Sequence, residues 1–162
     1  MDREERTDRV LRAIEATVSG DTSGVAELFT PDVVARSPTL SVSSRVELAV
    51  ELEDQEDGFS EVEVRPGPFV VDGDQICTEW VATALHSPPL APGEGWTRDS
   101  TDRRVTLRGV TVAEFAGDQI CIVRHYWDEG ERRLELGLPL PDRARPRATR
   151  RPVGPSSPGR RA

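Results

Sequence analysis

The chain of 162 residues contains no lysine and only two cysteines, two histidines and one tyrosine. No CxxC or HxxxH spacing is present, so nothing in the sequence indicates a metal site. An apolar run of 18 residues and a signal-peptide pattern are also lacking. We therefore expect a soluble, cytoplasmic protein with no membrane-spanning segment, in which Cys77 and Cys121 are reduced and act as small buried apolar residues.

Charge divides the chain into two parts. Residues 141–162 contain seven arginines, one aspartate and no aromatic residue, which gives this segment a formal charge of +6. Because the whole chain has a charge of −8, residues 1–140 carry −14. Residues 141–162 have too little apolar surface to offset the entropy of ordering, so we expect one domain at 1–140 and a disordered tail. The acidic domain argues against nucleic-acid binding, whereas the basic tail is either a solvated extension or a contact for an acidic partner.

The pentapeptide Gly-Asp-Gln-Ile-Cys occurs twice, at residues 73–77 and 117–121. Each copy lies between two runs of apolar or β-branched residues, and a Gly-Asp pair tolerates the positive φ angles of tight turns. The repeat therefore predicts two β-hairpins, the first at about 68–86 and the second at about 103–128. Alternating apolar and charged residues predict a further strand from residue 60 onward.

The N-terminal part of the chain has helical periodicity instead. Apolar residues spaced three and four apart predict a helix over residues 3–18. A second helix, whose apolar face includes Phe29, is expected next, and a third begins after a cap at Ser43 or Ser44. A short extended segment is expected at 33–38, because a residue before proline avoids the helical region. Three helices followed by antiparallel strands predict an α+β domain with the helices on one face of the sheet.

At four places the chain resembles the NTF2-like superfamily, and most of all its SnoaL-like polyketide cyclase branch, which is related to limonene-epoxide hydrolases and ketosteroid isomerases. The matching segments are AELFTPDVV (26–34), ARSP (35–38), GDQICTEWVATALH (73–86) and, most specifically, VTLRGVTVAEFAGDQICIVRHYWD (105–128). The resemblance implies a cone-shaped domain in which three N-terminal helices pack on a strongly curved, mainly antiparallel sheet and enclose an apolar pocket. It also implies a homodimer formed through the outer face of the sheet.

The resemblance places the strongest catalytic candidates near the end of the last strand. His125 stands where related epoxide hydrolases have an acid that points into the pocket, and Trp127 shares its face by strand alternation. Histidine exchanges a proton near neutrality, so His125 is either a catalytic acid/base or a pocket-wall residue that only hydrogen-bonds. Asp128 alternates outward or closes the strand, but the pocket aspartate of related cyclases keeps it a catalytic candidate.

Four further residues are candidates for binding a substrate. Trp80 and Trp127 either stack on a flat ligand or pack in the core. Arg36 occupies a position where relatives have a polar pocket residue, so it either holds a ligand oxygen or lies at the surface. His86 is expected at the pocket mouth. The epoxide hydrolases carry arginine and aspartate at the positions of Trp80 and Ala82, so their water-activating Asp-Arg-Asp set is absent here.

Together these residues favour a cofactor-independent enzyme of the polyketide cyclase type. It would perform acid/base cyclisation or isomerisation on a small apolar, polyketide-derived ligand, as in antibiotic biosynthesis and other secondary metabolism. No cofactor is required, because a conjugated substrate stabilises its own carbanion. The alternatives are a non-catalytic binding or association module, an atypical epoxide-opening enzyme and a dehydratase, since one scaffold hosts all of these functions.

Overall fold

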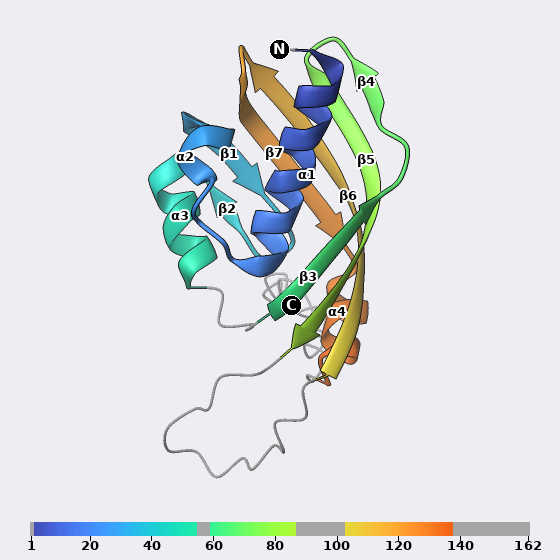
Figure 1. The fold of residues 1–162 in the computed structure, drawn as a ribbon. Helices are drawn as coiled ribbons and strands as arrows, with labels where there is room; N and C mark the ends of the chain where they lie inside the picture. The colour runs from blue at the N-terminus through green and yellow to red at the C-terminus, as the bar shows by residue number, and fades with distance from the viewer. Residues whose placement is uncertain (1, 55–58, 87–102, 138–162) are drawn as a thin grey trace, which may run out of the picture.

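The computed structural model describes residues 2–54, 59–86 and 103–137 (Figure 1). The elements in chain order are α1 (Arg3–Ser19), α2 (Val25–Leu28), β1 (Phe29–Arg36), β2 (Ser41–Val42), α3 (Arg45–Glu53), β3 (Phe59–Pro66), β4 (Val70–Asp72), β5 (Gln75–His86), β6 (Arg103–Ala116), β7 (Gln119–Trp127) and α4 (Glu129–Glu135). The expected tail at 141–162 lies outside the described residues. The expected α+β class, with helices on a curved and mainly antiparallel sheet, is confirmed.

The strands form one open sheet in the order β2-β1-β7-β6-β5-β3, with β4 also paired to β5. Both predicted hairpins are present, β4 with β5 and β6 with β7, and each turns at a glycine of the repeated pentapeptide with a positive φ angle. The pairing between the first and last long strands of the chain was not predicted. β1 lies parallel to β7, with Val34 opposite Ile122, so the N-terminal part of the chain is joined to its last strand.

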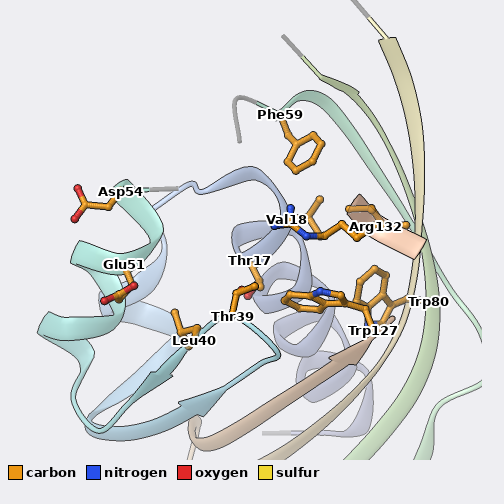
Figure 2. Close-up of a pocket in the computed structure, with 11 residues that line it drawn as sticks. Thr17, Val18, Thr39, Leu40, Glu51, Asp54, Phe59, Trp80, Trp127 and Arg132 are labelled. Carbon is orange, nitrogen blue, oxygen red and sulfur yellow. The ribbon is translucent and has the colours of Figure 1, made fainter. Parts of the chain in front are cut away.

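Helix α1 crosses the concave face of the sheet (Figure 1). Asp2 and Glu5 form a capping box at its start, and Gly20 ends it in the left-handed conformation, close to the predicted limit. Its buried stripe includes Val10 and Ile14, both fully inaccessible to solvent. The last turn of α1 borders the cavity shown in Figure 2. The helix thus forms one wall of the site.

The second predicted helix ends earlier than expected. α2 ends at Leu28, and Phe29, which we expected on its apolar face, is the first residue of strand β1 and is buried there. The extended segment expected at 33–38 is therefore the second half of a longer strand. The third helix begins as predicted after the cap Ser44. A fourth helix, α4, was not predicted.

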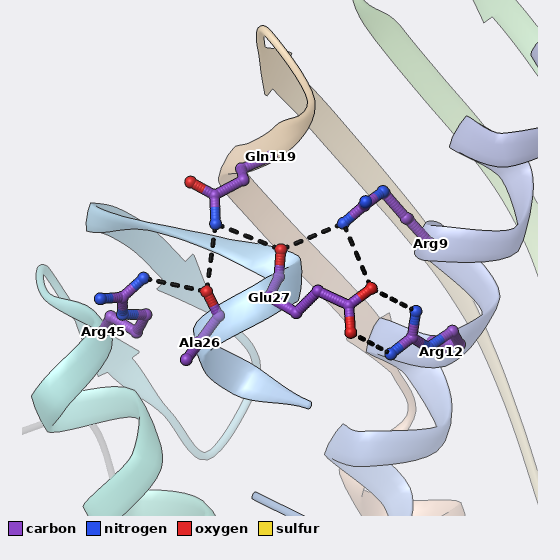
Figure 3. A network of polar contacts seen from close by, with 6 residues as sticks. All are labelled: Arg9, Arg12, Ala26, Glu27, Arg45 and Gln119. Carbon is purple, nitrogen blue, oxygen red and sulfur yellow. Dashed lines mark hydrogen bonds and ion pairs between the residues drawn. The ribbon is translucent and has the colours of Figure 1, made fainter. Parts of the chain in front are cut away.

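Polar contacts hold the short helix α2 against its neighbours (Figure 3). Arg12 of α1 makes two hydrogen bonds to the Glu27 carboxylate, at 3.0 and 3.1 Å. Gln119, at the β6–β7 turn, donates to the backbone carbonyls of Ala26 and Glu27, both at 3.1 Å, and Arg45 of α3 also donates to Ala26. A helix of four residues is not stable alone, so these bonds to its terminal carbonyls stabilise it.

The cysteines lie on strands that are not neighbours, because β6 separates β5 from β7. Cys77 and Cys121 are both free thiols, and each is partly buried instead of fully buried as expected. Within the described ranges, no helix has the length and apolar character needed to cross a membrane.

Candidate functional site

A cavity of about 250 Å³ lies between α1, α3 and the concave face of the sheet (Figure 2). Its apolar wall is formed by Val18, Leu40, Phe59, Trp80, Leu107 and Trp127. The two predicted tryptophans therefore meet at one site, although they come from different hairpins. Trp80 is only 3% exposed and also packs in the hydrophobic core, which was the alternative to stacking on a ligand.

Charged side chains stand on two sides of this cavity. Glu51 and Asp54 come from the end of α3, and Figure 2 shows them across the cavity from the tryptophans. Arg132 of α4 lines the side of the tryptophans, with 14% of its side chain exposed. Opposite charges thus flank a partly apolar space, which Thr17 and Thr39 also line.

Glu129 fixes the side of the cavity that carries Trp127. One of its carboxylate oxygens accepts from Trp127 Nε1 at 3.0 Å and from Arg132 Nε at 2.9 Å. Burial acts to raise the pKa of Glu129, but these two hydrogen bonds and the charges of Arg132 and Arg133 lower it overall. The ionised carboxylate therefore holds the indole and the guanidinium in place.

Sequence reasoning missed Glu129 and Arg132 because it did not predict α4. The usable pattern was an Asp followed by acidic residues and then Arg132 and Arg133, since these residues suit the first and last turns of a helix. The i,i+3 ion pair between Glu129 and Arg132 belongs to the same pattern.

His125 lies beneath the cavity, inside a continuous line of hydrogen bonds. Trp80 Nε1 donates to Thr111 Oγ1 at 2.9 Å, and Thr111 Oγ1 lies 2.8 Å from His125 Nδ1. On the other side, His125 Nε2 lies 3.1 Å from Thr17 Oγ1, which donates to the Ala13 carbonyl at 2.9 Å. Both ring nitrogens are therefore occupied by threonine hydroxyls.

Burial also decides the charge of His125. The side chain is 3% exposed, and desolvation lowers its pKa to about 4, so the imidazole is neutral at pH 7. Among the described residues that line the cavity, Thr17 is present and His125 is not. Thr17, which lines the cavity and whose hydroxyl contacts the ring, thus connects the histidine to the cavity.

Gly109 of β6 makes room for Trp80. The two residues are direct cross-strand partners. A Cβ at Gly109 would stand 2.3 Å from Cζ2 of Trp80 and 2.7 Å from the Tyr126 carbonyl oxygen. Only glycine leaves the indole space to lie across β6 and reach Thr111.

Asp128 and Arg36 lie away from the cavity. Asp128 is exposed and caps α4, accepting from the backbone N–H groups of Gly130 and Glu131 at 2.8 and 3.1 Å. Strand alternation allowed this end-of-strand position. Arg36 is exposed at the end of β1, in a separate groove beside Glu47, as its surface interpretation required. Neither side chain is brought to His125.

His86 stands at the end of β5, where its ring lies 5.3 Å from that of Phe59, measured between centroids. Phe59 lines the cavity, so His86 contacts a residue of the cavity wall. The structure therefore brings together Trp80, Trp127 and, through Thr17, His125. No three His, Cys, Asp or Glu side chains in the described part of the chain are placed to hold a metal ion.

Solved structures with the same fold support this arrangement of the sheet and helices. AclR from Streptomyces galilaeus, a proposed hydroxylase, is 22% identical with a TM-score of 0.63, and 87% of each chain is covered. A proposed SnoaL-like polyketide cyclase from Jannaschia sp. CCS1 is 18% identical with a TM-score of 0.64, covering 86% of this chain and 99% of that one. An LEH-like epoxide hydrolase from M. tuberculosis is 19% identical with a TM-score of 0.56, covering 77% and 79%. Identities this low show a shared fold alone.

No curated protein matches this chain. The SnoaL-like domain matches residues 10–123, from the first buried residue of α1 to the middle of β7. This span covers most of the described fold and ends just before His125 and Trp127. The resemblance seen in the sequence is thereby confirmed, and the chain belongs to the SnoaL-like domain family.

Proposed function

We propose that this chain binds a small, flat and largely apolar molecule of the polyketide-derived type in the cavity beside Trp80 and Trp127. The observation that supports this most is the cavity of about 250 Å³ with two indoles in its wall. Small-molecule sites are concave and mostly apolar with a few polar groups, and their usual volumes begin near roughly 300 Å³. Indole faces stack on flat ring systems, so the walls suit a compact ring compound.

A titration with flat ring compounds that carry a hydroxyl group, such as naphthols and hydroxyanthracenes, tests this proposal. Binding is followed by NMR through the indole N–H signals, and those of Trp80 and Trp127 are expected to shift. Trp127→Ala should weaken binding at least about tenfold, which corresponds to about 1.4 kcal/mol. The matched control is Tyr126→Ala, since Tyr126 is the preceding residue and is 54% exposed on the other face. Equal affinity in the two variants, or no shift with any compound, contradicts the proposal.

Cofactor-independent cyclisation or isomerisation of the bound molecule is the second candidate function. It is favoured by Thr17, which lines the cavity and whose hydroxyl contacts the His125 imidazole. Proton transfer from ligand to histidine would pass through this hydroxyl, and it requires a ring that carries its proton on Nδ1, so that Nε2 can accept. The low pKa of His125 makes the ring a weak base, which is why binding comes first. Asp128, the other acid/base candidate, would have to release the start of α4 to take part.

Turnover separates the two functions. If the chain is a cyclase or isomerase, Thr17→Val should still bind the compound but lose its conversion. Conversion that is unchanged in Thr17→Val rules out this route.

Association of two copies through the outer sheet face stays a prediction, which sedimentation of the wild-type protein tests.

A further inference from the structure

The hydrogen-bond line through His125 has two ends of fixed character. At one end the Trp80 indole N–H can only donate, and it donates to Thr111 at 2.9 Å. At the other end the Ala13 backbone carbonyl can only accept, and it accepts from Thr17 at 2.9 Å. The groups between them are two hydroxyls and a neutral imidazole, each able to donate one hydrogen.

These ends leave one assignment in which every hydrogen is used once. Thr111 accepts from Trp80 and gives its own hydrogen to His125 Nδ1. The ring proton is then on Nε2 and is donated to Thr17, whose hydrogen goes to Ala13. The reverse direction would make Thr111 accept two hydrogens while its own finds no place in the line. It would also give Thr17 two acceptors for one hydrogen, which is unfavourable in a buried site.

The surroundings of the imidazole agree with a neutral ring. The small space beside it is lined by apolar side chains, among them Phe29, Leu48, Leu52 and Val123, and no charged side chain of the described residues lines it. An imidazolium would therefore lie without a counter-charge in an apolar environment.

We propose that this directed chain locks His125 as the tautomer with its proton on Nε2, so that Thr17 offers the cavity a hydrogen-bond acceptor and the ligand contributes a hydroxyl donor. Thr17 receives one hydrogen and gives one, which leaves its second lone pair for the cavity that it lines. A ligand carbonyl at this place would have to take the Thr17 hydrogen from Ala13. The site thus selects phenols and enols over ethers and carbonyl compounds. The ligand part of this inference rests on the proposed function.

The tautomer is tested on the wild-type protein without any ligand. Nitrogen-15 NMR at pH 7 distinguishes protonated from unprotonated ring nitrogens, and His86→Gln assigns the signals because the chain has only two histidines. We expect Nε2 protonated and Nδ1 unprotonated. Thr111→Ser should keep this pattern, whereas Thr111→Val should give a mixture of tautomers. A ring protonated on Nδ1, or on both nitrogens, overturns the assignment.

The acceptor at Thr17 is tested with two matched probes, 2-naphthol and 2-methoxynaphthalene. Calorimetry should give at least a threefold tighter Kd for 2-naphthol, a preference kept in Thr17→Ser and lost in Thr17→Val. Equal binding of both probes overturns the acceptor role while the proposed function stands. No binding of either probe contradicts both the ligand part and the proposed function, and the tautomer is then judged from its own spectrum.

Discussion

The two Gly-Asp-Gln-Ile-Cys hairpins share one turn but differ in what surrounds them. Gly73 and Gly117 have nearly the same φ angle, 57° and 62°, and a Cβ added at either would meet no atom within 4 Å. After the turn, the first ladder continues regularly, whereas the second is interrupted by a bulge at Cys121. The pentapeptide therefore specifies a turn, and the neighbouring strands decide what the following residues do.

The same contrast holds for the glutamines and histidines of the two hairpins. Gln75 is exposed and its amide bonds to Glu114 at 3.3 Å, while Gln119 holds the carbonyls of α2. His86 ends its strand partly exposed, while His125 is buried between two threonines. The second hairpin lies between the two halves of the chain, and this position gives its side chains structural roles that the first copy lacks.

The largest expected difference between the two histidines is in how each makes the free energy of unfolding depend on pH. Because folding lowers the pKa of His125 from 6.5 to about 4, the unfolded chain takes up its proton first. Above pH 6.5 the ring is neutral in both the folded and the unfolded chain, and the free energy of unfolding has its full value. As the pH falls from 6.5 toward 4, the free energy of unfolding decreases by about 3 kcal/mol in total. Urea unfolding at a series of pH values measures it.

His125→Gln should flatten the dependence between pH 6.5 and 5, above the range in which most carboxylates titrate. His86→Gln, which leaves the buried ring in place, is the matched control, and the His125→Gln profile should be the flatter of the two. A wild-type free energy of unfolding that stays constant from pH 6.5 to 5 would mean that His125 is not held neutral by burial.

Gly109→Ala should give the next largest effect, because the strands that follow the two pentapeptides meet at this residue. The new Cβ would collide with the Trp80 ring and with the Tyr126 carbonyl, so the indole has to move. We expect a loss of about 2 kcal/mol in the free energy of unfolding. Gly24→Ala is the matched control, since its nearest atoms would be 3.5 and 3.6 Å away. Equal stability of the two variants would show that Trp80 does not need the space.

Gln119→Ala and Gln75→Ala form the smallest and most direct comparison. Gln119→Ala removes bonds to two carbonyls of α2 and should cost about 1 kcal/mol. The equivalent change at the exposed Gln75 should stay within about 0.5 kcal/mol. Chemical denaturation of both variants measures the difference, and similar values would remove the distinction between the two copies.

Local patterns predicted the elements whose determinants lie within a few residues. Helix α1 and the cap of α3 follow from apolar spacing and from Asp2, Gly20 and Ser44. Both hairpins follow from the repeated turn. The family resemblance placed His125 on the inner face of its strand, and the residue is buried there.

Elements that depend on distant residues could not be predicted in this way. The helical spacing of Val25, Leu28 and Phe29 suggested a helix that includes Phe29, but pairing with β7 takes Phe29 into β1. The role of Thr17 was hidden for the same reason, because its partner His125 stands more than a hundred residues away in the chain. His125 has the residue type of a catalytic acid/base, but it is buried below the cavity lining and does not line the cavity itself.

The parallel pairing of β1 with β7 also orders events during synthesis on the ribosome. Val34 finds its partner Ile122 only after most of the chain has been made, so closing this contact requires a large loop. Contacts of such long range slow folding, and the edge of β1 stays unpaired until β7 has been synthesised. We therefore expect nascent chains that end before β7 to depend on chaperones, and release from them to coincide with the emergence of the last strand.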